Sequence, residues 1–99
     1  MKQYTDEIQT AKLIELGFEK PRYATMFWRD NKEVTEINYT IGELIEMLPE
    51  FSCIYYLTNL HTMKRCWYAG HVSTLNVSAD ELIDALYDMI VKLKEEGVI

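Results

Sequence analysis

The chain has 99 residues, 48% of them hydrophobic and 26% charged, which is the composition of a single globular domain with a core of its own. Its 16 Asp and Glu residues outnumber its 10 Lys and Arg residues, and no window clusters the cations that non-specific binding to nucleic acid requires. No apolar run reaches the roughly 18 residues of a membrane-spanning helix and the start carries no apolar signal segment, so we expect a cytoplasmic protein whose Cys53 and Cys66 are reduced thiols.

The first periodic segment predicts a helix from about residue 5 or 6 to residue 16. Asp6 and Gln9 offer a weak capping box at its start. Gly17 followed by Phe18 is typical of a helix end at which glycine adopts a left-handed conformation and the next residue folds back onto the helix. Both ends of this helix are therefore predicted.

Residues 22–38 predict a β-hairpin. Residues 25–29 are β-branched and aromatic, residues 30–32 supply turn chemistry, and residues 33–38 alternate between polar and apolar types. The segment from Tyr39 to Pro49 predicts a short helix of about two turns, because Thr40 and Glu43 form a second capping box and the proline prevents continuation. Its periodicity turns Ile45 inward and Glu43 outward. Glu46 is expected on the same solvated face as Glu43.

Residues 51–59 and 64–72 are the two strongest strand signals. Neither alternates cleanly, which favours one exposed aromatic face over a sheet covered on both sides. Residues 73–78 are expected to lead from the second of these strands into the last helix.

The last helix is expected within residues 77–98. Ser78 and Glu81 match a capping box, and Gly97 matches a helix end like that at Gly17. Asp84 and Asp88 fall on the face expected to be solvated. The core-facing stripe comprises Leu82, Ile83, Leu86, Met89, Ile90 and Leu93.

The order α-β-β-α-β-β-α with hairpin-length connections predicts a single α+β domain over residues 1–99. One four-stranded antiparallel sheet carries the helices on one face in this prediction, with the last helix lying across it. A parallel dinucleotide-binding fold would need a glycine-rich turn after a strand, which the four glycines do not supply.

We predict no catalytic residue, metal ligand or cofactor. Cys53, Cys66, His61 and His71 lack the spacing of zinc ligands, and Cys66 and His71 would point to opposite faces of an extended strand. Arg65, adjacent to Cys66, would also point away from the thiol and would not activate it as a nucleophile. No phosphate-binding loop, hydrolase elbow or calcium loop occurs.

Five aromatic residues form the candidate interaction surface. Tyr and Trp are enriched at the energetic centres of protein interfaces. An aromatic sheet can also stack nucleic-acid bases, but the acidic balance argues against such a partner. The alternative for these side chains is a place in the core. They are Trp28, Tyr55, Tyr56, Trp67 and Tyr68.

Five segments together resemble a group of small uncharacterised proteins encoded by phages, prophages and other mobile elements of Bacteroides-type bacteria. They are TAKLIELGFEKP (10–21), MFWRD (26–30), YTIGELIEMLP (39–49), CWYAG (66–70) and ELIDALYDMIVKLKEEGVI (81–99). The group has no assigned activity, cofactor or catalytic residue. The resemblance therefore implies only a cytoplasmic accessory protein of a mobile element.

Three functions remain open at this point. The first is a non-enzymatic accessory factor that binds a protein partner through the aromatic sheet face or an unpaired sheet edge. The second is an acidic mimic of nucleic acid that inhibits a host DNA-binding protein, which requires carboxylates concentrated on one face. The third is a small enzyme or ligand-binding domain, which requires a pocket that gathers Cys, His and carboxylate groups. Neither a nucleic-acid nor a membrane partner is expected, and a homodimer is compatible with the sequence.

Overall fold

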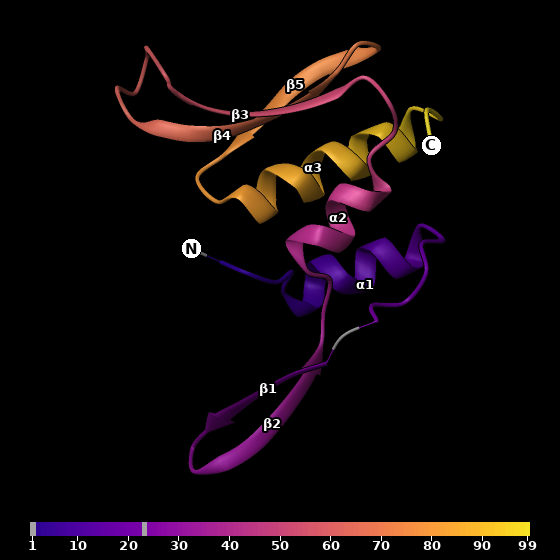
Figure 1. Ribbon diagram of the computed structural model, residues 1–99, viewed down its shortest axis with the longest axis vertical. Coiled ribbons are helices and arrows are strands. Elements are labelled where there is room, and N and C mark those ends of the chain that lie inside the picture. Colours follow the sequence, from indigo (N-terminus) through magenta and orange to yellow (C-terminus); the bar gives the residue numbers. More distant parts are fainter. Residues whose placement is uncertain (1, 23) are drawn as a thin grey trace.

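The computed structural model describes residues 2–22 and 24–99, and in this part of the chain the strands form two separate antiparallel sheets (Figure 1). The α+β class is confirmed, but the single four-stranded sheet is wrong. The elements in chain order are α1 (Glu7–Glu15), β1 (Ala24–Arg29), β2 (Lys32–Ile37), α2 (Ile41–Met47), β3 (Ser52–Thr58), β4 (Arg65–His71), β5 (Thr74–Ala79) and α3 (Leu82–Glu95).

The second sheet contains a strand that was not predicted, β5. The residues expected to lead into the last helix instead turn back after His71 and pair with β4, in the register His71↔Thr74 and Ala69↔Val77. The second sheet therefore has the order β3-β4-β5, with β3 and β5 as its two edges. The β1-β2 hairpin projects from the opposite end of the molecule (Figure 1).

Helix α3 begins later than predicted, because Ser78 belongs to β5, where it pairs with Tyr68. Glu81 occupies the N-cap position and makes no side-chain capping hydrogen bond, so the predicted capping box of Ser78 and Glu81 is wrong. The end of the helix is confirmed. Gly97 has a φ of 76°, and the amide of Val98 donates to the Leu93 carbonyl at 2.9 Å.

The other predicted local signals are confirmed. Asp6 and Gln9 form a reciprocal capping box on α1, and Thr40 and Glu43 form one on α2. Asp30 and Asn31 both have positive φ, 52° and 61°, as a two-residue hairpin turn of the mirror-image type requires. Each of these structures depends on neighbours within a few residues, which is why the sequence predicts them well.

The orientation of α2 differs from the prediction. Glu43 is only 5% exposed, whereas Ile45 is 46% exposed. The backbone amide of Arg22 donates to Glu43 Oε2 at 3.1 Å, and the Thr40 amide donates to Oε1 at 3.2 Å. Because these donors satisfy the carboxylate, it can be buried at the start of α2, and the prediction that it faces solvent is wrong.

Helix α3 is the central layer of the molecule. One side packs on α1 and α2 through a cluster that includes Leu13, Tyr39 and Leu44, and the other side packs on β4 and β5 around Ala69. Its fully buried residues are Ile83, Ala85, Leu86, Met89, Ile90 and Leu93. Since each buried large aliphatic side chain contributes about 1.5–3 kcal/mol, α3 is the main source of hydrophobic stability and fixes the inner face of the three-stranded sheet.

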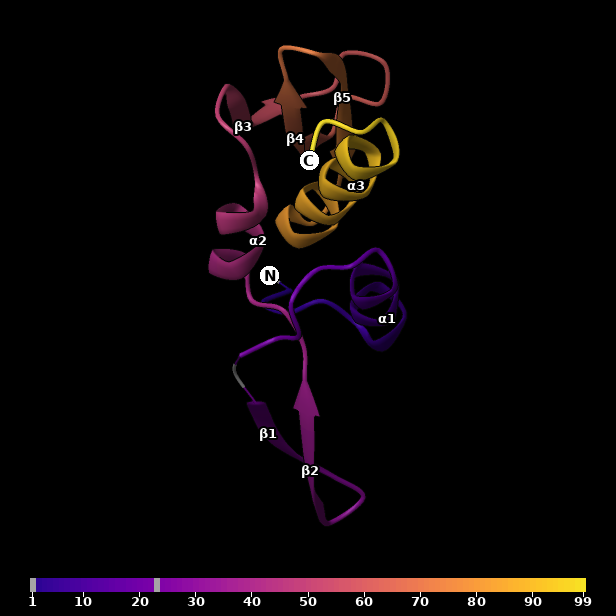
Figure 2. The same ribbon diagram turned by 90° about the vertical axis from the view of Figure 1, so that its right-hand side faces the viewer.

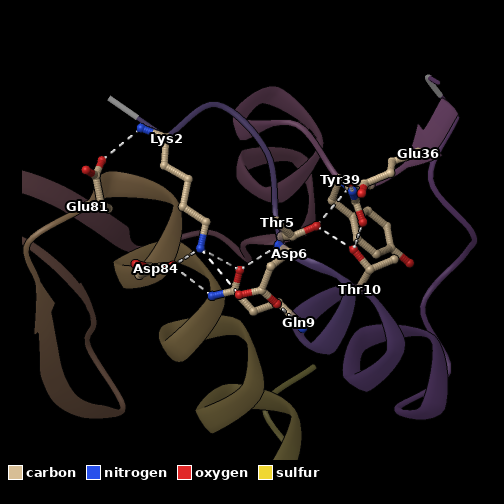
Figure 3. A network of polar contacts seen from close by, with 10 residues as sticks. Lys2, Thr5, Asp6, Gln9, Thr10, Glu36, Tyr39, Glu81 and Asp84 are labelled. Carbon is tan, nitrogen blue, oxygen red and sulfur yellow. Dashed lines mark hydrogen bonds and ion pairs between the residues drawn. The ribbon is translucent and has the colours of Figure 1, made fainter. Parts of the chain in front are cut away.

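A network of polar contacts joins the start of the chain to α3 (Figure 3). Lys2 Nζ donates to Asp84 Oδ1 at 2.8 Å, and the Gln9 side chain donates to the same oxygen at 2.8 Å. The Lys2 backbone amide donates to Glu81 Oε2 at 3.0 Å. Asp84, predicted to be solvated, is instead the point at which the N-terminal segment is attached to the last helix.

Candidate interaction surface on the three-stranded sheet

The three-stranded sheet has one covered face and one open face. The inner face packs on α3 through residues that include Trp67, Ala69 and Val77. Successive side chains of a strand point to opposite faces, so Tyr55, Leu57 and Tyr68 belong to the outer face. Figure 2 shows the three helices on the inner side, and no other described element covers the outer side.

The structure distributes the five candidate aromatic residues over three places. Tyr55 and Tyr68 are paired on the outer face of the sheet, whereas Tyr56 and Trp67 are paired on the inner face. Trp28 lies on the distant β1-β2 hairpin and is 74% exposed. The structure therefore assembles two cross-strand pairs and leaves Trp28 apart from both.

The two rings of the outer pair lie face to face. The rings of Tyr55 and Tyr68 are stacked, with centroids 5.1 Å apart and planes inclined by 9°. Such a pair contributes about 0.5–1.5 kcal/mol beyond its buried area. The Asn76 amide on β5 donates to the Tyr55 hydroxyl, which joins the third strand to the pair. The Cys66 thiol beside Tyr68 raises the pKa of that phenol, which remains a neutral hydroxyl at physiological pH.

Gly70 makes room for this arrangement. A Cβ atom at Gly70 would lie 2.1 Å from Asn76 Oδ1 and 3.4 Å from Cys53 Sγ. Any larger residue would therefore displace the Asn76 side chain from Tyr55. This glycine is required for close side-chain approach on the outer face and not for an unusual backbone angle.

The inner pair has a structural role. Tyr56 and Trp67 meet edge to face, with centroids 4.8 Å apart, and the Arg65 guanidinium lies 4.7 Å from the centre of the Tyr56 ring. Trp67 also packs against the α3 cluster. Its replacement would disturb the core as well as any surface contact, so it is a poor probe of binding.

The acidic residues that give the chain its net charge of -6 are unevenly distributed along the sequence. None of the 16 Asp and Glu residues falls between positions 51 and 79, the segment that forms the whole three-stranded sheet and its turns. The formally charged side chains of this segment are Lys64 and Arg65. The strands that form the outer face therefore carry no carboxylate of their own, and Asp80, directly after β5, lines a cavity with Cys66 and Ser78 at the border of that face.

The thiols and imidazoles do not form a metal centre in the described residues, where no group of three or more His, Cys, Asp or Glu side chains could hold a metal ion. Cys53 is exposed and Cys66 is buried. His71 is held by Ser73 and by the Glu50 carbonyl.

Two cavities bear on the ligand-binding hypothesis. A shallow cavity of about 400 Å³ is lined by Cys66 and Asp80, but no histidine is among its lining residues. A cavity of about 250 Å³ between Tyr39 and Glu43 is smaller than the roughly 300–1,000 Å³ typical of ligand pockets. Neither cavity gathers the Cys, His and carboxylate groups that this hypothesis requires.

Comparison of the chain with family models, curated proteins and solved structures finds no match. In the described part of the chain, no helix has both the length and the apolar content needed to cross a bilayer. Function is therefore inferred from the geometry and charge of the chain itself.

Proposed function

We propose that this protein is a non-enzymatic interaction module that binds a protein partner on the outer face of its three-stranded sheet. The observation that carries the proposal is the stacked Tyr55–Tyr68 pair on an uncovered face whose strands contain no carboxylate. Because the rings are already held in place by each other and by Asn76, little side-chain freedom is lost when a partner covers them. Aromatic residues of this kind dominate the energetics of protein interfaces.

The charge of the surface limits the chemistry of the partner. Lys64 lines a cavity with the outer-face residues Cys66 and Ser78, whereas the Arg65 guanidinium lies over the inner-face ring of Tyr56. With Lys64 as the charged group of the segment on this side, the outer face suits a protein surface that is uncharged or acidic. The resemblance to small proteins of phages and mobile elements supports the further proposal that this module is a cytoplasmic accessory factor of such an element. Its partner is then a protein of the host or of the phage.

The test is capture of the partner from native bacterial lysate at low salt. A variant with Tyr55→Ala and Tyr68→Ala should lose a partner that the wild type retains. Trp28→Ala is the matched control, because it removes an exposed aromatic residue outside the sheet. Urea denaturation of both variants checks that each one is folded, and mass spectrometry identifies the bound protein.

Three outcomes would contradict the proposal. The first is retention of the partner by the Tyr55 and Tyr68 variant. The second is loss of the partner only in the Trp28 variant. The third is loss of the captured material after nuclease treatment, which would show that the stacked rings bind nucleic acid instead of protein.

Acidic mimicry of nucleic acid is the second candidate. The observation in its favour is the concentration of all carboxylates outside positions 51–79. Some of them are already engaged within the molecule, as Glu43 is with Arg22 and Asp84 is with Lys2. A mimic would capture a DNA-binding protein, added DNA would displace that protein, and the Tyr55 and Tyr68 variant would still bind it. The first proposal expects that added DNA does not displace the partner and that the variant does not bind it.

A further inference from the structure

The strand β3 is an edge of the sheet that lacks the usual protection against pairing. Natural edge strands are guarded by charged residues, proline or bulges, because their free amides and carbonyls are a template for another strand. The sequence of β3, SCIYYLT, contains no charged residue and no proline. Figure 2 shows β3 as the outermost strand on its side, with no described element beyond it.

The opposite edge of the same sheet is protected. Lys92 of α3 donates through Nζ to the Leu75 carbonyl of β5 at 3.2 Å. The pairing of β5 with β4 is also interrupted by a register shift between Ala69 and His71. The two edges therefore differ, and β3 is the one open to a new strand.

Exposed apolar residues flank β3 at both of its ends. Phe51 lies directly before the strand, and Leu60 and Met63 lie in the turn after it, each between 73 and 83% exposed. Phe51 also has a φ of 66°, an unfavourable conformation for a bulky residue. These three side chains are at opposite ends of one strand, and an antiparallel copy of that strand would bring the two ends together.

The charge distribution permits a second copy of the chain to pair at this edge. Two copies of a chain with a net charge of -6 repel each other at most orientations. When two copies meet through residues 51–79, no carboxylate of this segment faces a carboxylate of the other copy, because the segment contains none. The edge of β3 is thus a surface on which a second copy can be accommodated without like-charge contacts.

We propose that two copies of this chain pair antiparallel through β3, with the twofold axis at Tyr55, and so join two three-stranded sheets into one of six strands. In this register Ile54 lies opposite Tyr56 of the second copy, and Phe51 of each copy approaches Leu60 of the other. The four tyrosines, two from each copy, form one row across the outer face. This inference goes beyond the proposed function and does not depend on it, because pairing at the edge leaves the outer face uncovered.

The first test is the oligomeric state by sedimentation over a range of protein concentrations. The wild type should form a dimer, and Leu57→Lys, which adds a charge to the β3 edge, should raise its Kd by about tenfold or more. Leu75→Lys is the matched control, because it adds the same charge to an exposed leucine of the other edge strand and should leave the dimer intact. Circular dichroism checks that both variants are folded.

The second test fixes the register by disulfide formation. In a chain with Cys53→Ser and Cys66→Ala, Tyr55→Cys should form an intermolecular disulfide under mild oxidation, because residues at the axis lie within the roughly 5.5 Å of bonded cysteines. Thr58→Cys in the same background should not, since the two copies of position 58 would be about 20 Å apart at about 3.3 Å per residue.

Monomeric wild type at all concentrations would overturn the proposal. So would a dimer that Leu75→Lys disrupts and Leu57→Lys does not, or cross-linking through position 58 in place of position 55. These assays contain only the purified chain, so their failure leaves partner capture by the outer face unaffected. The partner-capture test is likewise independent of dimerisation, because a monomer can also lose its partner when Tyr55 and Tyr68 are replaced.

Discussion

At the level of single residues, two aspartates one turn apart on α3 have opposite electrostatic environments. Burial opposes the ionisation of Asp84, but the hydrogen bonds from Lys2 and Gln9 and the charge of Lys2 outweigh it, and its pKa lies below the usual 3.8. Desolvation, followed by the charge of Asp84, raises the pKa of Asp88. The first carboxylate therefore favours the folded state when ionised, and the second does not.

This difference predicts opposite pH dependences. Because the folded pKa of Asp84 is below its unfolded value, the stabilisation by this carboxylate is present above pH 3.8 and is lost as the pH falls through the folded pKa. Asp84→Asn should lower the free energy of unfolding at neutral pH by about 0.5–1 kcal/mol, and the deficit should disappear in acid. Asp88→Asn should leave stability at neutral pH unchanged or slightly increased. Urea denaturation at a series of pH values measures both, and a deficit for Asp84→Asn that persists in acid would contradict the assignment.

The roles of Asp84 and Glu43 could not be predicted from the sequence, because their partners are not local. Asp84 is bound by Lys2, 82 positions away, and Glu43 by the backbone of Arg22, 21 positions away. Helical periodicity assigns both to a polar face, and on average such a face is solvated. Only the tertiary arrangement shows that a carboxylate on that face has buried donors.

At the level of elements, the helix caps and the hairpin turn that depend on local sequence were predicted correctly. The role of Ser78 was not, because this residue could either cap a helix or belong to a strand. The pattern Thr40-x-x-Glu43 and the pattern Ser78-x-x-Glu81 are equivalent in sequence. The first caps α2, whereas Ser78 is in β5 because Val77 and Ala79 pack on α3. Sheet pairing with β4 decides between the two structures, and this pairing is long-range.

The equivalence of the two patterns gives a direct prediction for paired substitutions. Thr40→Ala should lower the free energy of unfolding by about 1 kcal/mol, because the Thr40 hydroxyl accepts from the Glu43 amide at the start of α2. Ser78→Ala should change it by less than about 0.5 kcal/mol, since Ser78 is exposed on the outer side of β5 and caps no helix. Chemical denaturation of both variants checks this. Equal losses would mean that Ser78 caps α3 after all.

The candidate surface could be predicted only in part from the sequence, because the packing of the sheet on α3 is also long-range. Adjacent residues of a strand point to opposite faces, so Trp67 and Tyr68 cannot share a surface, but which of them faces α3 depends on how the helix packs. The absence of carboxylates between positions 51 and 79 was readable without a structure. Its meaning depends on the fold, because that segment coincides with one complete sheet.

At the level of the whole molecule, the segregation of charge determines how two copies respond to salt. The carboxylates lie outside the three-stranded sheet, so a dimer formed through β3 keeps them away from its interface but still joins two acidic bodies. Their repulsion acts over the Debye length, which falls from about 30 Å at 0.01 M salt to about 3 Å at 1 M. An interface based on strand pairing and apolar contacts contains no ion pairs that salt would weaken.

Dimerisation should therefore become tighter as sodium chloride is added, and sedimentation at several salt concentrations measures the Kd. Lys64→Glu places a carboxylate in the segment that lacks one, and it should weaken the dimer most at low salt, where screening is least. Lys20→Glu changes the net charge by the same amount outside this segment and should have a smaller effect. A dimer that weakens with salt, or that responds equally to the two substitutions, would show that the copies meet through charged surfaces elsewhere on the molecule and not through β3.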